Sequence, residues 1–76
     1  MPKFPRSLPA TDLIKALCKL GFVQKRQKGS HVILIKESGG EKIGCVVPLH
    51  RELKVGTIKG ILKQAKVSEE EVFGLL

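Results

Sequence analysis

The chain has 76 residues, of which 14 are Lys or Arg and 7 are Asp or Glu, so its formal net charge is +7. A chain of this length has room for one small domain, which buries only about 60 % of the surface that the unfolded chain exposes. The sequence contains no apolar run of the roughly 20 residues needed to cross a bilayer, and its start lacks the pattern of a secretory signal. We therefore expect a cytoplasmic protein with no membrane partner, formed by a single domain over residues 1–76 in which residues 1–10 are a proline-rich leader.

The positive charge is concentrated in the first half of the chain. Residues 1–36 carry eight Lys or Arg against a single Asp, whereas residues 37–76 carry six residues of each sign. A concentrated positive field favours binding to a polyanion such as nucleic acid, because each neutralised phosphate releases condensed counterions. A solvated surface that only keeps the protein soluble explains the charge alone equally well.

The first predicted elements are a helix and three strands. Apolar side chains at helical spacing, among them Leu17 and Cys18, predict a helix over residues 11–20. Three runs of strand length follow, separated by glycine-containing turns, and they predict an antiparallel meander. These runs cover residues 22–27, 32–35 and 43–47.

The last part of the chain has two helix signals. Thr57 can cap a helix whose apolar stripe consists of Ile58, Ile61, Leu62 and Ala65. Ser68 and Glu71 have the spacing of a capping box and predict a short helix that runs to the C-terminus. The element order predicts an α+β fold, a two-layer α-β-β-β-α sandwich with an antiparallel three-stranded sheet and a short extra C-terminal helix.

The cysteines and histidines do not form a recognisable metal site. Cys18 and Cys45 lie within apolar patterns, so we interpret both as reduced core residues rather than as a disulfide or as nucleophiles. Together with His31 and His50 they amount to four zinc ligands, but no pair has the short spacing of a structural zinc site. We therefore expect no metal and no cofactor.

His31 is the strongest candidate for a residue that takes part in chemistry, because it follows a glycine-containing turn and has cations nearby. A histidine titrates near pH 6.5 and can take or give a proton on a phosphodiester at neutral pH. Lys25, Arg26 and Lys28 are placed to offset the negative charge that grows in such a reaction. A turn histidine bonded to backbone is the structural alternative.

Five segments in register are similar to the HicA family of mRNA interferase toxins, and they span nearly the whole chain after about Thr11. They are LCKLGF at 17–22, RQKGSH at 26–31, VPLH at 47–50, ELKVGT at 52–57 and ILKQA at 61–65. The resemblance implies a fold like the double-stranded-RNA-binding domain, endoribonuclease activity on mRNA, and neutralisation by a HicB-type antitoxin. It also implies that His31 is the catalytic residue. Lys66 departs from the family, in which glycine is common at this helix end.

The resemblance also suggests an RNA-binding set around the catalytic histidine. Gly29 is expected to let the backbone approach RNA, although a tight turn alone explains it. His50 is either a second proton-transfer group or RNA contact, or a structural residue of its loop. The complete expected RNA-binding set is Lys25, Arg26, Lys28, Gly29, Ser30 and His50.

Two other functions fit the same residues. One is a non-catalytic module that binds double-stranded RNA through its shape and phosphates. The other is a protein-interaction domain whose basic half binds an acidic partner.

With three Phe and no Tyr or Trp, the sequence has few side chains for stacking on bases. We therefore expect contacts with phosphate and sugar to dominate and sequence preference to be modest.

Overall fold

The computed structural model describes residues 7–76 and has the predicted α+β architecture. Its elements in chain order are β1 (Ser7–Leu8), α1 (Ala10–Lys19), β2 (Val23–Lys28), β3 (His31–Ser38), β4 (Glu41–Pro48), β5 (Leu53–Lys54), α2 (Val55–Ala65) and α3 (Glu69–Phe73). The α-β-β-β-α order and the short C-terminal helix confirm the predicted fold class, and the arrangement is consistent with the double-stranded-RNA-binding-domain fold. Among the described residues, no helix is long and apolar enough to span a bilayer.

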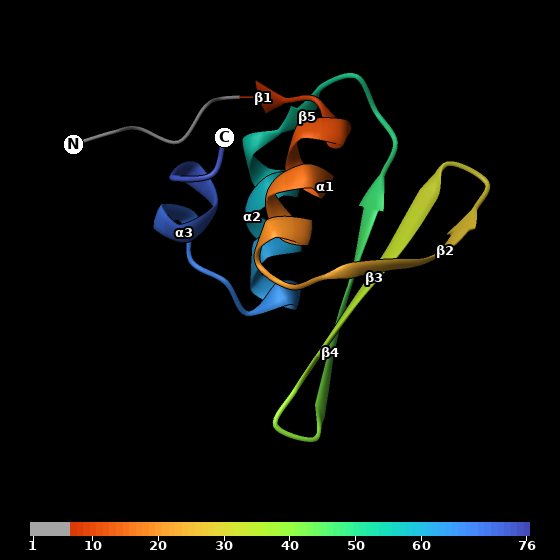
Figure 1. The fold of residues 1–76 in the computed structure, drawn as a ribbon. Coiled ribbons are helices and arrows are strands. Elements are labelled where there is room, and N and C mark those ends of the chain that lie inside the picture. The colour runs from red at the N-terminus through yellow and green to blue at the C-terminus, as the bar shows by residue number, and fades with distance from the viewer. Residues whose placement is uncertain (1–6) are drawn as a thin grey trace.

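The main sheet has the strand order β2-β3-β4, with antiparallel neighbours as predicted (Figure 1). The β3–β4 hairpin is longer than the predicted strands and extends beyond the helices. Its turn consists of Gly39 and Gly40, which have φ angles of 56° and 82°. Two consecutive positive φ angles are typical of a type I′ turn, whose twist matches that of the strands it joins.

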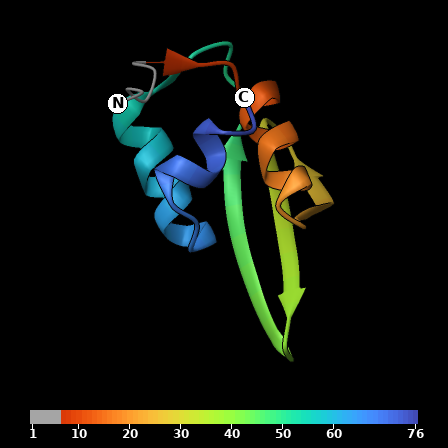
Figure 2. The ribbon, with the colours of Figure 1, turned by 60° about the vertical axis from the view of Figure 1, so that its left-hand side comes forward.

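The helices pack on one face of this sheet, and the other face is open (Figures 1 and 2). Alternate residues of β3 and β4 point into the core, since side chains alternate between the two faces of a strand. The predicted stripe of α2 is buried throughout. The buried residues of these three elements are Val32, Leu34, Cys45, Val47, Ile58, Ile61, Leu62 and Ala65. On the open face, Val23 and Val46 keep 54 % and 40 % of their surface exposed.

A second, two-stranded sheet was not predicted. Ser7 pairs with Lys54 and Leu8 with Leu53, and both leucines are buried. Two residues of the expected leader, Ser7 and Leu8, therefore form a strand, and residues 1–6 lie outside the described residues. Strands of two residues have no hydropathy period, so only their pairing in the folded protein reveals them.

The start of α2 differs from the prediction. The helix begins at Val55, and its N-cap is Lys54, which makes no side-chain capping hydrogen bond. Thr57 is therefore inside the first turn and does not cap the helix. The pairing of β5 with β1 explains the difference, because it fixes the chain in an extended conformation up to Lys54, directly before the helix.

The C-terminus of α2 and the N-terminus of α3 have well-defined caps. Lys66 ends α2 in the left-handed conformation with φ 57°, which is the conformation that favours glycine at this position. The predicted capping box of α3 is confirmed: Ser68 Oγ accepts the Glu71 N–H at 3.1 Å, and Glu71 Oε1 accepts the Ser68 N–H at 3.0 Å. The Ser68 backbone N–H, followed by its side chain, lowers the pKa of the Glu71 carboxyl.

The two cysteines differ in their surroundings. Cys45 is buried as predicted, and burial raises the pKa of its thiol to about 11. The prediction that Cys18 is a core residue is wrong, because its side chain is exposed. The buried face of α1 instead passes through Leu13, Ala16 and Leu17. Cys18 lies about 100° further around the helix than Leu17, outside this face. Both cysteines are free thiols.

Candidate active site

The candidate site is built on the tight turn between β2 and β3. Gly29 and Ser30 form this turn, and Gly29 has φ 59°. A positive φ at the first central residue alone matches a type II′ turn, which is the glycine-dependent hairpin turn. The Gln27 side-chain Nε2 donates to the Gly29 carbonyl at 3.2 Å, and the Ser30 carbonyl accepts the Leu49 N–H at 2.6 Å. The turn is therefore bonded both to its own strand and to the segment after β4.

His31 is the first residue of β3 rather than part of the turn itself. It lies between Lys28 of β2 and Pro48 of β4, each of which is its direct partner across the sheet. Directly paired residues point to the same face of a sheet. The His31 side chain is exposed, so it stands on the open face, at the end of the sheet where the β2–β3 turn lies.

A β-bulge arranges the neighbouring cations. The register of β2 against β3 shifts between Gln24 and Arg26, which leaves Lys25 as the extra, unpaired residue. Arg26 pairs with Ile33, two residues from His31 along β3, and therefore shares its face. Arg26, Lys28 and His31 are thus brought together on the open face, whereas Lys25 is exposed beside them on the bulge.

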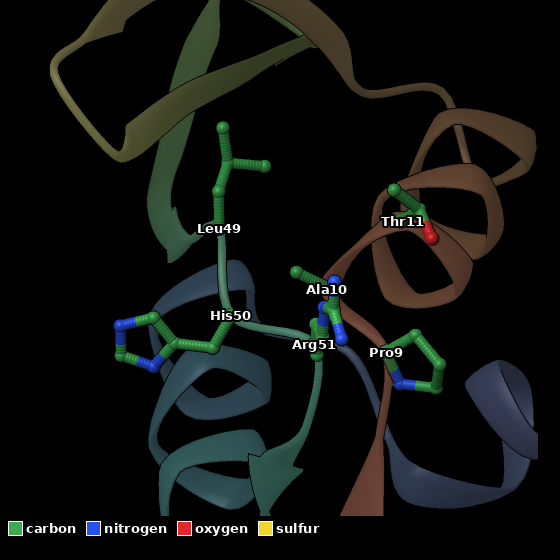
Figure 3. Close-up of a pocket in the computed structure, with 6 residues that line it drawn as sticks. All are labelled: Pro9, Ala10, Thr11, Leu49, His50 and Arg51. Carbon is green, nitrogen blue, oxygen red and sulfur yellow. The ribbon is translucent and has the colours of Figure 1, made fainter.

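His50 lies close to this site along the backbone, in the connection that follows β4. Its N–H donates to the Pro48 carbonyl at 2.9 Å, and its carbonyl accepts the Ala10 N–H at 3.1 Å. Its imidazole is exposed, and in Figure 3 it points away from Pro9 and Thr11. The backbone of His50 therefore joins this connection to the start of α1, and its side chain remains accessible.

Sequence reasoning missed the residue that joins these parts. Leu49 connects the turn to the segment of His50 through its backbone N–H, and no side-chain pattern signals such a contact. Gln64 of α2 was also missed: its Oε1 accepts the Val46 N–H at 3.4 Å, at the outer edge of β4. Both contacts hold β4 and its following loop in place beside His31.

The arrangement is suited to proton transfer near a bound anion. His31 can exchange a proton, and Arg26 and Lys28 on the same face can stabilise negative charge on a phosphate. The four zinc-ligand candidates considered from the sequence are not assembled: within residues 7–76, no group of three or more His, Cys, Asp or Glu is placed to hold a metal ion.

The chain matches a known protein family. A family model described as the HicA toxin of bacterial toxin-antitoxin systems matches residues 10–67. This span starts with α1, ends just beyond α2, and contains the whole three-stranded sheet together with His31 and His50. A search of curated proteins finds no match.

Proposed function

This chain belongs to the HicA toxin family of bacterial toxin-antitoxin systems, and on that premise we propose that it is an endoribonuclease that cleaves mRNA in the cytoplasm. His31 is the general acid or base, and the reaction needs no metal ion. Membership of the family also means that the protein has an antitoxin partner. We propose that this partner is of the HicB type.

The observation that carries the proposal is the direct pairing of His31 with Lys28 on an uncovered sheet face. A phosphodiester placed against this face meets a proton acceptor and a cation from adjacent strands. Arg26 supplies a second cation one cross-strand pair further along the same face. Side chains mounted on paired strands are held more precisely than side chains in a loop, which favours a fixed reaction geometry.

The reaction follows from the chemistry of RNA. The ribose 2′-OH loses its proton to the His31 imidazole as its oxygen attacks the adjacent phosphorus. The bond from phosphorus to the 5′-oxygen breaks, that oxygen takes up a proton, and the products carry a 2′,3′-cyclic phosphate and a 5′-hydroxyl. Negative charge grows on the phosphoryl oxygens during this step, and Arg26 and Lys28 stabilise it.

The turn supplies further RNA contacts in this proposal. A side chain added at Gly29 would have no atom within 4 Å, so the backbone there is open to an approaching strand. Lys25 on the bulge and Ser30 in the turn are exposed and flank the same path. These groups contact phosphate and sugar, so we expect binding to weaken steeply as the salt concentration rises.

The proposal is tested with purified protein in EDTA and two single-stranded oligonucleotides of the same mixed sequence. One is RNA, and the other carries 2′-deoxyribose at every position. We expect cleavage of the RNA alone. Cleavage of the deoxy strand at a similar rate contradicts attack by the 2′-OH. Binding of RNA without any cleavage favours the non-catalytic RNA-binding module instead.

A further inference from the structure

An open hollow lies beside the candidate active site, between the start of α1 and the connection from β4 to β5. Its volume is about 380 Å³, which is within the range of small-ligand sites. Three of its lining residues come from each segment, and they are Pro9, Ala10, Thr11, Leu49, His50 and Arg51 (Figure 3). The Ala10 N–H donates to the His50 carbonyl, so the two walls are bonded to each other.

The hollow is close to His31. Its lining residue Leu49 bonds directly to Ser30, the neighbour of His31, through the 2.6 Å backbone hydrogen bond. Pro48 pairs with His31, and His50 follows two residues later, so the Cα atoms of the two histidines are at most about 13 Å apart. A strand of RNA bound at His31 can therefore continue into the hollow.

The lining is mostly apolar, and two of its residues have planar polar side chains. Pro9, Ala10 and Leu49 contribute carbon atoms, whereas Thr11 contributes one hydroxyl. Arg51 and His50 both line the hollow and have exposed side chains, and the His50 imidazole points away from Pro9 and Thr11 (Figure 3). Arginine planes and histidine rings are surfaces on which unstacked RNA bases stack.

We propose that this hollow binds one unstacked base of the RNA, next to the phosphodiester that is cleaved at His31. The inference rests on the proposed function and adds a base-binding subsite to it. Arg51 supplies the main stacking surface, and the apolar lining excludes water from the face of the base. Because Thr11 is the one side-chain hydroxyl in the lining, the hollow accepts different bases with modest discrimination.

A simple electrostatic contact between Arg51 and a phosphate is the competing explanation. Base stacking and a phosphate contact respond differently when the base is removed from the RNA and when Arg51 is replaced by lysine. Stacking requires the base on the RNA and the planar guanidinium on the protein, whereas a phosphate contact requires only a positive charge.

The test measures binding by fluorescence anisotropy, in the full-length His31→Ala protein so that the RNA stays intact. The probes are a labelled mixed-sequence RNA of about ten nucleotides and the same strand with every base removed. We expect the baseless strand to bind about tenfold more weakly. Adding Arg51→Ala or Arg51→Lys should remove most of that difference. Adding Lys59→Ala, which removes an exposed cation that does not line the hollow, should leave it intact.

The possible failures are distinct. Equal binding of the two strands by the His31→Ala protein overturns the base-binding hollow and leaves RNA binding in place. A full tenfold difference retained in Arg51→Lys overturns the stacking role, since a lysine provides charge alone. Failure to bind either strand overturns both the base-binding role of the hollow and the proposed RNA substrate.

Discussion

His31 and Lys28 face each other across the β2–β3 hairpin, as the pair that encloses the two-residue turn of Gly29 and Ser30. This pairing fixes a cation beside the proposed proton-transfer group. It depends on the turn, because a one-residue shift of register would send His31 or Lys28 to the opposite face of the sheet. The turn glycine thus matters for the site through the geometry that it allows.

The first prediction concerns Lys28. We expect Lys28→Ala to lower the RNA cleavage rate by about tenfold to a hundredfold, because a cation near the reacting phosphate is lost. The slope of log affinity against log salt should also become shallower by about one unit. Lys42→Ala is the matched control, since Lys42 of β4 pairs with Glu37 of β3 near the β3–β4 turn, at the opposite end of β3 from His31. Equal effects of the two variants would contradict a local role for Lys28.

The second prediction concerns thiol reactivity. Cys18 is exposed, whereas Cys45 is buried and has a pKa raised to about 11 by that burial. Near pH 8, Cys45 therefore has very little of the reactive thiolate. We expect iodoacetamide to modify Cys18 in the folded protein and Cys45 only in denaturant, as followed by peptide mass spectrometry. Equal labelling of both without denaturant would contradict the buried position of Cys45.

The third prediction concerns the end of α2. Lys66 has φ 57°, a conformation that costs a residue with a Cβ atom about 1–2 kcal/mol. We expect Lys66→Gly to raise the free energy of unfolding by about 0.5–1 kcal/mol, since glycine removes this cost and loses some of the gain to chain entropy. Urea denaturation measures the change. Lys63→Gly is the control, because it places glycine in the last turn of the helix and should destabilise.

The fourth prediction concerns pH. Hydrogen bonds from Ser68 lower the pKa of Glu71 below its usual value of 4.5, so the folded state favours the ionised carboxylate. The stabilisation is therefore present above the usual pKa and is lost as the pH falls through the lowered one. We expect wild type to be more stable than Glu71→Gln at pH 7 in urea denaturation. This advantage should shrink toward pH 3, and a constant advantage would contradict the prediction.

The parts of the fold with a clear sequence period could be predicted. The buried stripe of α2, the strands of the main sheet and the capping box at Ser68 all appear where their patterns indicate. The pairing of β1 with β5 could not be predicted, because it joins short segments that are distant along the chain. The prediction for Cys18 was wrong because its hydrophobicity suggested the core, whereas the buried face of α1 passes through Leu13, Ala16 and Leu17.

The grouping of the candidate residues around His31 could be predicted from the sequence, whereas their geometry could be predicted only in part. The residues around His31 are neighbours in sequence, so their grouping was visible. The bulge at Lys25 was not visible, and it is the bulge that sets which side chains of β2 share a face with His31. The hollow beside the site was also hidden, since Thr11 and Arg51 come from separate segments that meet only in the folded chain.

The central claim is that His31 transfers the proton in a metal-independent cleavage of RNA. The most direct test compares wild type, His31→Ala and His50→Ala on a mixed-sequence single-stranded RNA in EDTA, with circular dichroism to confirm folding. We predict that wild type cleaves and that His31→Ala loses about 100-fold or more of the rate, as expected for a lost general acid or base. His50→Ala should retain more activity than His31→Ala. Equal cleavage by wild type and folded His31→Ala would contradict the claim.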